Sequence, residues 1–202
     1  TLPYFVASRI RSVKGNRQPS LTDCMPLPIA IDYRPALLSR AGIGRATREL
    51  SRTLSSCPEI SVHLFAHSLA RAKVAIEVPN NAHLYRLPIA GRALPMLRKL
   101  GIGAERLAGN ARLFHFTDYV QPPVKNARTV LTVHDLAFVR NPAWHGDQAA
   151  ELASRTQAAI AQADALIVPS TTTANDVRKF APDGPPMSVI PLGSDHVPTQ
   201  QF

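Results

Sequence analysis

The sequence predicts an α/β protein built on an open, doubly wound parallel sheet, and three observations lead to that prediction. Short apolar segments of strand length alternate with segments of helical periodicity along most of the 202 residues, the order expected of a parallel sheet with crossover helices. The apolar segments are nearly continuous, as in strands that are buried on both faces. Apolar residues make up 45% of the chain and charged residues 18%, which is typical of one globular domain with its own core.

We expect this Rossmann-like domain to span residues 27–193, after an irregular, basic leader at 1–26 that lacks periodicity. Residues 28–33 are apolar until they end in polar side chains, which predicts a buried first strand. Residues 34–44 are expected to form a loop. The helix expected at residues 45–56 has small or apolar side chains at helical spacing, namely Ala46, Leu50, Thr53 and Leu54.

The middle of the domain adds two strands and an interrupted helix. Residues 60–66 and 82–87 have the composition of the second and third strands. Residues 92–107 have helical periodicity, but Pro95 and the glycines around Gly101 are expected to divide the helix.

Four more strands and two helices complete the alternation. Residues 129–133 give the clearest strand, because β-branched side chains recur through it. Ser170 precedes a helical segment and has the side chain of an N-cap. The remaining expected elements are strands at 112–116, 165–168 and 188–190 and helices at 148–163 and 172–180.

The charge of the chain is unevenly distributed. The net charge is +9, with thirteen basic and five acidic side chains in residues 28–113, but six basic and eight acidic in residues 114–202. Nucleic acid, an anionic membrane surface or a phosphate-bearing ligand could each bind the basic half. Aromatic residues make up only 6% of the chain and form no nucleic-acid-binding motif with the basic ones, so we expect no nucleic-acid partner.

Several classes of protein lack their usual signals in this sequence. No apolar segment approaches the roughly 18 residues of a membrane span. Two cysteines, Cys24 and Cys57, cannot build a disulfide framework, which favours a reducing, cytoplasmic compartment. No His, Asp and Glu residues have metal-site spacing, and neither a phosphate-loop lysine nor a serine elbow is present. We therefore expect no metal and no cofactor.

Ligands of doubly wound sheets bind beyond the carboxyl ends of the strands, so we expect site residues after strands one, four, five and six. After the first strand, two glycines, a helix N-terminus and a cation would suit a phosphate. Because the third glycine of a dinucleotide fingerprint is missing, a plain tight turn is the alternative. The residues of this turn are Gly42, Ile43, Gly44 and Arg45.

Three later strand ends carry polar candidates. After the fifth strand, His134 could hydrogen-bond a hydroxyl-rich ligand and Asp135 could orient its ring, or the two could be a surface pair that never meets. Asp118, after the fourth strand, could contact a substrate hydroxyl or cap its loop. Ser170, after the sixth, could line the site, although N-capping explains it without a ligand. The basic stretch 86–112 could lie on an anionic membrane or pack its apolar face on the sheet.

These motifs occur together, in this order, in one protein family. The sequence resembles the N-terminal domain of family 4 glycosyltransferases, which are retaining enzymes with two Rossmann-like domains in the GT-B arrangement. The resemblance covers residues 28 to about 196 and implies the N-terminal half of a GT-B fold. The matching segments are residues 31–34, 42–45, 47–50, 132–136, 163–170 and 189–195, together with Pro142.

The resemblance also implies roles for individual residues. The Gly42–Gly44 turn resembles the loop that meets the donor diphosphate, and His134 is similar to the histidine that contacts the transferred sugar. Ser170 matches the serine on the edge of the interdomain cleft. Two positions depart from the family pattern: Ala46 replaces a frequent aromatic residue, and Ser194 replaces a usual apolar one.

The function that the resemblance implies is that of the acceptor-side domain of a retaining glycosyltransferase of hexosyl or mannosyl type. It would transfer a sugar from a nucleotide-sugar donor to a glycan or lipid-linked acceptor in polysaccharide biosynthesis. The alternative is a non-catalytic Rossmann-like module that binds a nucleotide or a sugar phosphate.

In this family a second, C-terminal domain supplies most of the donor site, whereas this chain stops at Phe202. We therefore expect residues 194–202 to begin the interdomain linker, and we expect little or no transferase activity from the chain by itself. The expected location is the cytoplasm, with peripheral contact at the inner face of the plasma membrane.

Overall fold

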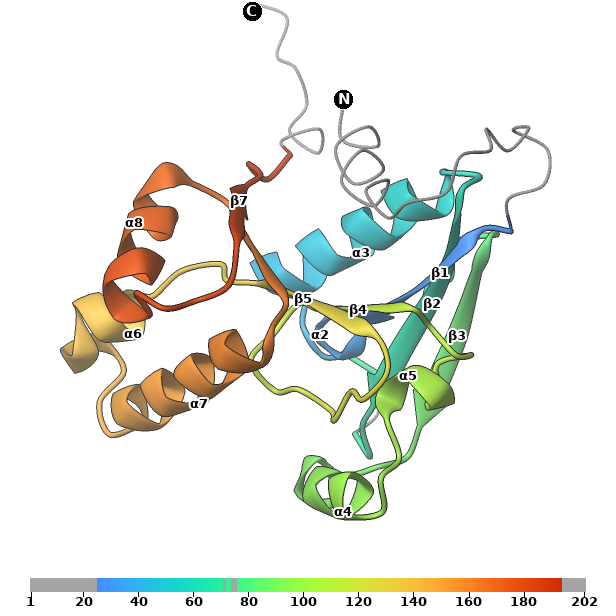
Figure 1. Ribbon diagram of the computed structural model, residues 1–202, viewed down its shortest axis with the longest axis horizontal. Coiled ribbons are helices and arrows are strands. Elements are labelled where there is room, and N and C mark those ends of the chain that lie inside the picture. The colour runs from blue at the N-terminus through green and yellow to red at the C-terminus, as the bar shows by residue number, and fades with distance from the viewer. Residues whose placement is uncertain (1–24, 71, 74–75, 194–202) are drawn as a thin grey trace, which may run out of the picture.

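The protein folds into one seven-stranded, all-parallel sheet with helices on both faces (Figure 1). The structure is a computed structural model and describes residues 25–70, 72–73 and 76–193. The predicted fold class is confirmed. The predicted leader, apart from its last two residues, and the predicted linker at 194–202 lie outside the described residues.

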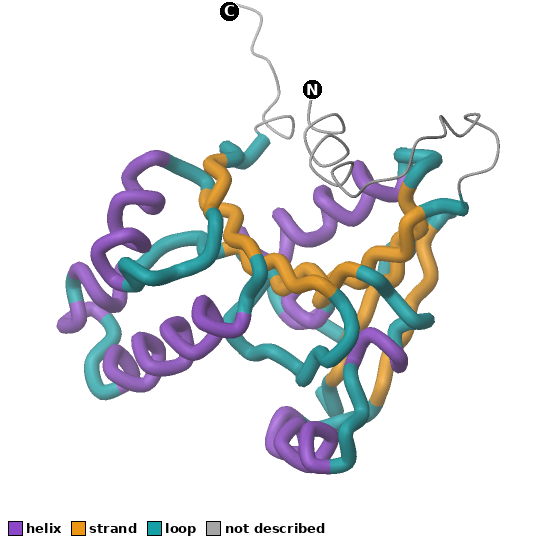
Figure 2. Tube along the Cα trace, viewed as in Figure 1, coloured by secondary structure: helices purple, strands orange, loops and turns teal. Residues whose placement is uncertain are grey.

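The strands agree with the predicted ones to within one residue at each end (Figure 2). They are β1 (Leu27–Asp32), β2 (Ile60–His67), β3 (Ala82–Leu87), β4 (Leu113–Phe116), β5 (Arg128–Thr132), β6 (Ala165–Val168) and β7 (Met187–Val189). The helices are α2 (Arg34–Leu38), α3 (Gly42–Ser55), α4 (Leu94–Lys99), α5 (Ala104–Leu107), α6 (Ala137–Arg140), α7 (Gln148–Gln162) and α8 (Thr171–Phe180), with 3-10 turns η1 (Gly91–Ala93) and η2 (Pro142–Trp144).

The order of the strands places a switch point in the middle of the sheet. The order is β3-β2-β1-β4-β5-β6-β7, so the chain first builds outward from β1 to β3 and then returns to the other side of β1 to start β4. The crossovers that leave β1 and β4 therefore diverge, which makes the carboxyl ends of these two strands the switch point of the sheet. This is where ligands bind in doubly wound sheets.

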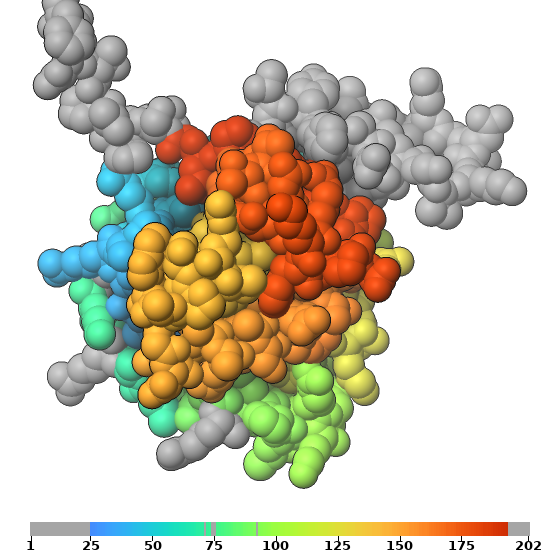
Figure 3. All heavy atoms as spheres, turned by 90° about the vertical axis from the view of Figure 1, so that its left-hand side faces the viewer, coloured from blue at the N-terminus to red at the C-terminus, as the bar shows by residue number. Residues whose placement is uncertain are grey.

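The two faces of the sheet have separate cores. One face packs Ile31 and Leu64 against Leu37 of α2. On the other face, Phe65, Phe114 and Phe116 form the aromatic centre of a larger core. Alanines and aliphatic residues of α5, α7 and α8 cover it. Viewed from the end of the sheet that carries β7, side chains of the α6 to α8 region close over this end of the molecule (Figure 3).

Helix α3 differs from its prediction in its start and in its buried face. It begins at Gly42, three residues earlier than expected, and it buries Gly44, Thr47, Ser51 and Ser55 rather than the predicted apolar positions. The three hydroxyls each donate to the carbonyl four residues before, at 2.7–2.8 Å. Because these side chains are small and their hydroxyls find acceptors within the helix, the helix can pack closely without an apolar face.

Two further differences concern short helices. Helix α2 lies within the predicted loop at 34–44, where Pro35 near its start favours a helical turn. Helix α6 and the turn η2 follow β5 in a segment for which no element was expected. The division of residues 92–107 is confirmed, since η1, α4 and α5 replace one continuous helix. Within the described part of the chain, no helix is both long and apolar enough to cross a bilayer.

Candidate functional site

The carboxyl ends of four neighbouring strands bring together a group of polar side chains. Asp32 ends β1, His67 ends β2, Asp118 follows β4 and His134 follows β5. The strands are adjacent in the order β2-β1-β4-β5, so these residues share one edge of the sheet. We define the carboxyl-edge cluster as Asp32, Arg34, His67, Thr117, Asp118 and His134.

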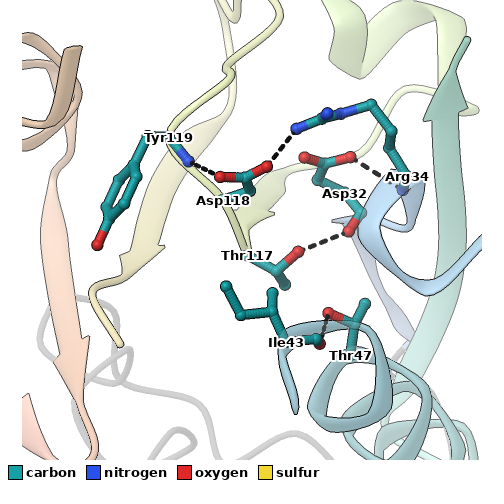
Figure 4. Close-up of polar contacts among 7 residues, drawn as sticks. All are labelled: Asp32, Arg34, Ile43, Thr47, Thr117, Asp118 and Tyr119. Carbon is teal, nitrogen blue, oxygen red and sulfur yellow. Dashed lines mark hydrogen bonds and ion pairs between the residues drawn. The ribbon is translucent and has the colours of Figure 1, made fainter. Parts of the chain in front are cut away.

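An ion pair across the switch point joins the segments after β1 and β4 (Figure 4). The Arg34 guanidinium lies 2.5 Å from Oδ2 of Asp118, and both side chains are largely buried. The other Asp118 oxygen accepts a 2.6 Å hydrogen bond from the backbone N–H of Tyr119. Asp118 therefore caps its loop, one of its two predicted roles, and in addition ties that loop to α2. The Thr117 hydroxyl donates to the Asp32 carbonyl at 2.8 Å and is a second link between the segments after β1 and β4.

Asp32 is a fully buried carboxyl group beside this ion pair. Its Oδ1 accepts a 3.1 Å hydrogen bond from the backbone N–H of Arg34, whereas its Oδ2 has no partner. Burial raises the pKa of Asp32 to about 7, although the nearby charge of Arg34 acts in the opposite direction. Asp32 is not among the site residues expected from the sequence, although it is the last residue of β1, after which a site was expected.

His134 and Asp135, which the sequence placed together, have different surroundings. Burial lowers the pKa of His134, opposed in part by a hydrogen bond to the backbone of Thr117. Its Nε2 is buried without a partner. Asp135 is exposed, and its Oδ1 accepts a 2.8 Å hydrogen bond from the backbone N–H of Ala137. Asp135 thus holds the first residue of α6 from the position before the N-cap residue Leu136, and the Tyr119 hydroxyl donates to the Asp135 carbonyl at 3.0 Å.

The glycine turn forms the first turn of α3, and its two glycines have different reasons to be there. A Cβ on Gly44 would lie 2.3 Å from the Ser39 carbonyl oxygen and 2.7 Å from that of Pro35, so close packing of α2 and α3 requires glycine. A Cβ on Gly42 would meet nothing within 4 Å. Arg45 is exposed.

The N-terminus of α3 adjoins the carboxyl-edge cluster. The first turn packs on α2 at Gly44, which lies against the carbonyl groups of Pro35 and Ser39, and Arg34 of the cluster is the first residue of α2. Figure 4 draws Ile43 and Thr47 of α3 together with the cluster residues. The N-cap residue Ala41 has no side chain that could accept a hydrogen bond from the first turn. A 14-residue helix whose first amide groups lack a side-chain cap favours an anion at this end.

Ser170 is placed one strand further along the edge, after β6, and acts as an N-cap. Its Oγ accepts a 3.1 Å hydrogen bond from the backbone N–H of Thr173 and lies 3.0 Å from the Thr173 hydroxyl. The structure therefore places the glycine turn, Asp118 and His134 after the neighbouring strands β1, β4 and β5, whereas Ser170 is engaged as the N-cap of α8 and Asp135 in a hydrogen bond to the first residue of α6.

Sequence reasoning missed His67, because it selected the segments after strands one, four, five and six but not after strand two. His67 is 2% exposed and neither ring nitrogen has a partner. Burial lowers its pKa to about 4, and the charge of Arg34 acts in the same direction. The strand-end rule applied to every strand would have found it. By contrast, two other buried histidines have partners. His115 lies 2.8 Å from Thr132 Oγ1, and His63 lies 2.5 Å from the Ala108 carbonyl oxygen.

Unpartnered polar atoms concentrate at this edge. In the described residues, seven buried side-chain nitrogen or oxygen atoms have no hydrogen-bond partner. Six of the seven belong to residues at or just after the ends of β1, β2, β4 and β5, and the seventh is the Thr156 hydroxyl. Because buried polar groups are normally paired, such a concentration marks a place where a ligand or water supplies the partners. The residues are Asp32, Arg34, His67, Gln121 and His134.

Two hollows are lined by residues outside this cluster. One of about 300 Å³ lies between α8 and β7, and one of about 170 Å³ lies between α3 and the segment around Glu77. Neither is lined by an unpartnered buried atom, so the polar chemistry marks the candidate site. The described ranges hold no group of three His, Cys, Asp or Glu side chains arranged to bind a metal ion.

Comparisons with known proteins agree with this picture. The family model described as Glycosyltransferase Family 4 matches residues 40–197. A structure of sucrose-phosphate synthase from Thermosynechococcus elongatus is similar, with a TM-score of 0.60 and 19% identity over 83% of this chain and 48% of that one. A shorter chain of the same enzyme gives a TM-score of 0.52 and 16% identity over 85% of this chain and 91% of that one. No curated protein sequence matches the chain significantly.

Proposed function

This chain belongs to glycosyltransferase family 4, and from that premise we propose that it is the acceptor-side domain of a retaining glycosyltransferase. It would help to transfer a hexosyl group, such as mannosyl, from a nucleotide-sugar donor to a glycan or lipid-linked acceptor. The observation that carries this proposal is the uncapped N-terminus of α3, which lies beside the carboxyl-edge cluster at the switch point of the sheet.

The donor diphosphate would bind at the first turn of α3. The amide groups of Gly42, Ile43 and Gly44 lack a side-chain cap, and the open space around Gly42 lets a phosphate approach the backbone. When the bond between sugar and diphosphate breaks, negative charge grows on the leaving phosphate. The helix N-terminus and the exposed Arg45 would stabilise that charge, so the first turn favours the transition state over the ground state. We propose that no metal ion is needed for this step.

The transferred sugar would lie against His134. Since burial lowers the pKa of this histidine, the ring is neutral near pH 7 and can hydrogen-bond a sugar hydroxyl through Nε2, which has no partner in the protein. The contact would orient the donor rather than move a proton.

The chain spans 48% of the length of the longer sucrose-phosphate synthase chain that it matches. We propose that a second domain completes the donor site and that the 202 residues alone have little or no transferase activity. We also propose a cytoplasmic location with peripheral contact to an anionic membrane face. In its support, α4 and the residue after it expose Met96 and Leu100 close to Arg98 and Lys99.

A change at the N-cap of α3 tests the proposal. Ala41 is exposed and has the extended backbone of an N-cap, so Ala41→Asp would supply a carboxylate to the amides that are proposed to bind phosphate. We expect the helix to gain about 1 kcal/mol of stability and the Kd for UDP or GDP, measured by calorimetry, to rise about tenfold or more.

The neutral cap Ala41→Ser is the matched control, because it satisfies the amides without a charge and should weaken nucleotide binding less. Unchanged nucleotide affinity in Ala41→Asp would contradict the proposed phosphate site. Transfer from UDP- or GDP-hexoses by the 202 residues alone would contradict the incomplete site. Nucleotide binding with no transfer even after the downstream coding sequence is joined to the chain would favour the non-catalytic module.

A further inference from the structure

The carboxyl-edge cluster contains more unpartnered polar groups than a nucleotide-sugar donor at α3 and His134 would use. Oδ2 of Asp32, Nε of Arg34 and both ring nitrogens of His67 are buried without partners. Asp32 and His67 are 0% and 2% exposed. Leaving such groups unpaired is costly because each has lost its hydrogen bonds to water, so their concentration needs an explanation.

These groups lie on one side of the sheet. Asp32 is level with Phe65 in the parallel register of β1 and β2, and His67 is two residues beyond Phe65, so Asp32 and His67 project from the same face at the same edge. The ring of His67 is stacked on Phe65, with centroids 6.1 Å apart. The Asp118 carboxylate lies beside the Asp32 carboxyl group (Figure 4).

We infer that Asp32, Arg34, His67 and Asp118 form a subsite for an uncharged, hydroxyl-bearing group of the acceptor. The inference rests on the proposed transferase function and adds to it the chemical class of the acceptor group and the residues that hold it. We call these four residues the acceptor subsite.

The chemistry of the four residues selects a hydroxyl. A sugar hydroxyl both donates and accepts, so one hydroxyl can donate to a carboxyl oxygen of Asp32 while its neighbour accepts from Nε–H of Arg34. His67, neutral because burial lowers its pKa to about 4, offers one further donor and one further acceptor to the same two hydroxyls. A vicinal diol therefore matches the unpartnered atoms in number and kind.

The charge balance excludes an ionic group at the same place. The charge of Arg34 is already paired with Asp118 at 2.5 Å, and Asp32 adds a second acid, so a phosphate would meet two carboxyl groups without a free cation. An ammonium group would meet the Arg34 guanidinium. The phosphate-binding chemistry of this edge belongs instead to the first turn of α3, on the other side of Thr117.

The test uses the 202-residue chain with isotope-labelled histidine, observed by NMR. The probes are methyl α-D-mannopyranoside and methyl α-D-glucopyranoside, compared with mannose 6-phosphate and glucose 6-phosphate. We expect the neutral glycosides to shift the imidazole signals of His67, and the phosphates to shift them less at equal concentration. His63, buried and partnered by Ala108 and Ser61, is the internal control and should not respond.

Two variants probe the residues around His67. Asp118→Asn should raise the glycoside concentration at half-shift about tenfold, because the charged pair with Asp118 holds the Arg34 guanidinium and so positions its Nε–H for the sugar hydroxyl. Its matched control is Asp164→Asn, which removes the carboxylate of another Asp–Arg pair, with Arg128 at 2.6 Å, at the opposite edge of the sheet. That variant should leave the titration unchanged. If Asp118→Asn does not fold, Asp32→Asn serves in its place, because it removes only an unpaired buried oxygen.

A second titration separates this inference from the proposed function. UDP and GDP should shift the backbone amide signals of Gly42 and Ile43 whether or not the acceptor subsite exists. A nucleotide response with no glycoside response at His67, or a stronger response there to the 6-phosphates, overturns the acceptor subsite and leaves the transferase proposal standing. A glycoside response without a nucleotide response supports the subsite and contradicts the donor site. Silence in both titrations overturns both.

Discussion

Buried polar side chains are hydrogen-bonded at the amino edge of the sheet, whereas several at the carboxyl edge have no partner. At the amino edge, Glu105 is 2% exposed, and its carboxylate accepts hydrogen bonds from the backbone of Lys125 and Asn126 at 3.2 and 3.1 Å. Asp164 at the same edge accepts from Arg128 and Thr129. At the carboxyl edge, Asp32 and His67 are equally buried but have unpartnered atoms.

The paired groups hold the fold together, whereas the unpaired groups are those that we propose to bind a ligand. A paired buried carboxylate pins two segments together, and its removal leaves several donors unsatisfied. An unpaired one lowers stability in the free protein, a cost that only a bound partner removes. Substitutions at the two edges should therefore change stability in opposite directions.

The largest expected effect is at the amino edge. Glu105→Ala removes a buried carboxylate that accepts two charge-assisted hydrogen bonds, from the N–H groups of Lys125 and Asn126, so we expect a loss of about 3–5 kcal/mol in the free energy of unfolding. Urea denaturation measures it. The control is Glu49→Ala on the exposed face of α3, where the ion pair with Arg52 is solvated and the loss should stay below about 0.5 kcal/mol. Equal losses in the two variants would remove the distinction on which the comparison rests.

The opposite sign is expected for Asp32→Asn. The folded pKa of Asp32 is about 7, above the ordinary 3.8, so between these values the folded state keeps a proton that the unfolded state has lost. The contribution of Asp32 to stability therefore falls as pH rises from about 4 to 7 and then stays low. Asp32→Asn should gain about 2–4 kcal/mol over the natural chain at pH 8 and little near pH 4.

The difference between the two chains must be measured, because other groups titrate in the same interval. His67 and His115 both have pKa values lowered to about 4 by burial, which makes stability rise with pH up to about 6.5 in either chain. Subtracting the two unfolding curves cancels these histidines to the extent that they are independent of Asp32. A difference that does not grow with pH would contradict the unpaired state of Asp32.

A smaller effect separates the two glycines of the first turn of α3. Gly44→Ala forces a methyl group against the carbonyl oxygens of Ser39 and Pro35 and should cost about 1–3 kcal/mol. Gly42→Ala points into open space and should leave thermal stability almost unchanged. The same methyl group should weaken UDP binding, however, since it occupies the approach to the proposed phosphate site. Parallel thermal melts and nucleotide titrations would show whether stability and binding separate in this way.

The sequence predicted the sheet well and the site in part. Nearly continuous apolar segments located all seven strands to within a residue, because burial on both faces leaves a strong local signal. The predicted buried face of α3 was wrong. Thr47 and Ser51 can be buried because their hydroxyls donate to carbonyls of the same helix, and polar residues of this kind leave no apolar periodicity in the sequence. The five-residue helix α2 is too short to give a periodic pattern.

The sequence also indicates some of the candidate site residues but not their contacts. The glycine turn, Asp118 and His134 follow strands and could be selected by position. The pairing of Arg34 with Asp118 joins residues 84 positions apart, and the lack of partners at Asp32 and His67 depends on every neighbouring chain segment. Neither property is encoded in a local pattern, so only the folded arrangement shows it.

The place of β1 in the sheet also has a consequence for how the protein forms during synthesis. β1 is the first strand along the described chain, yet it pairs with both β2 and β4. The strands β1, β2 and β3, on one side of the switch point, are all synthesised once residue 87 has left the ribosome. The strands β4 to β7 must be synthesised before they can pair with β1 and complete the sheet. The ion pair between Arg34 and Asp118 forms only when β4 pairs with β1. We therefore expect the proposed glycoside binding to report the completion of folding, because a chain stopped after residue 87 would contain the first turn of α3 but neither Asp118 nor His134.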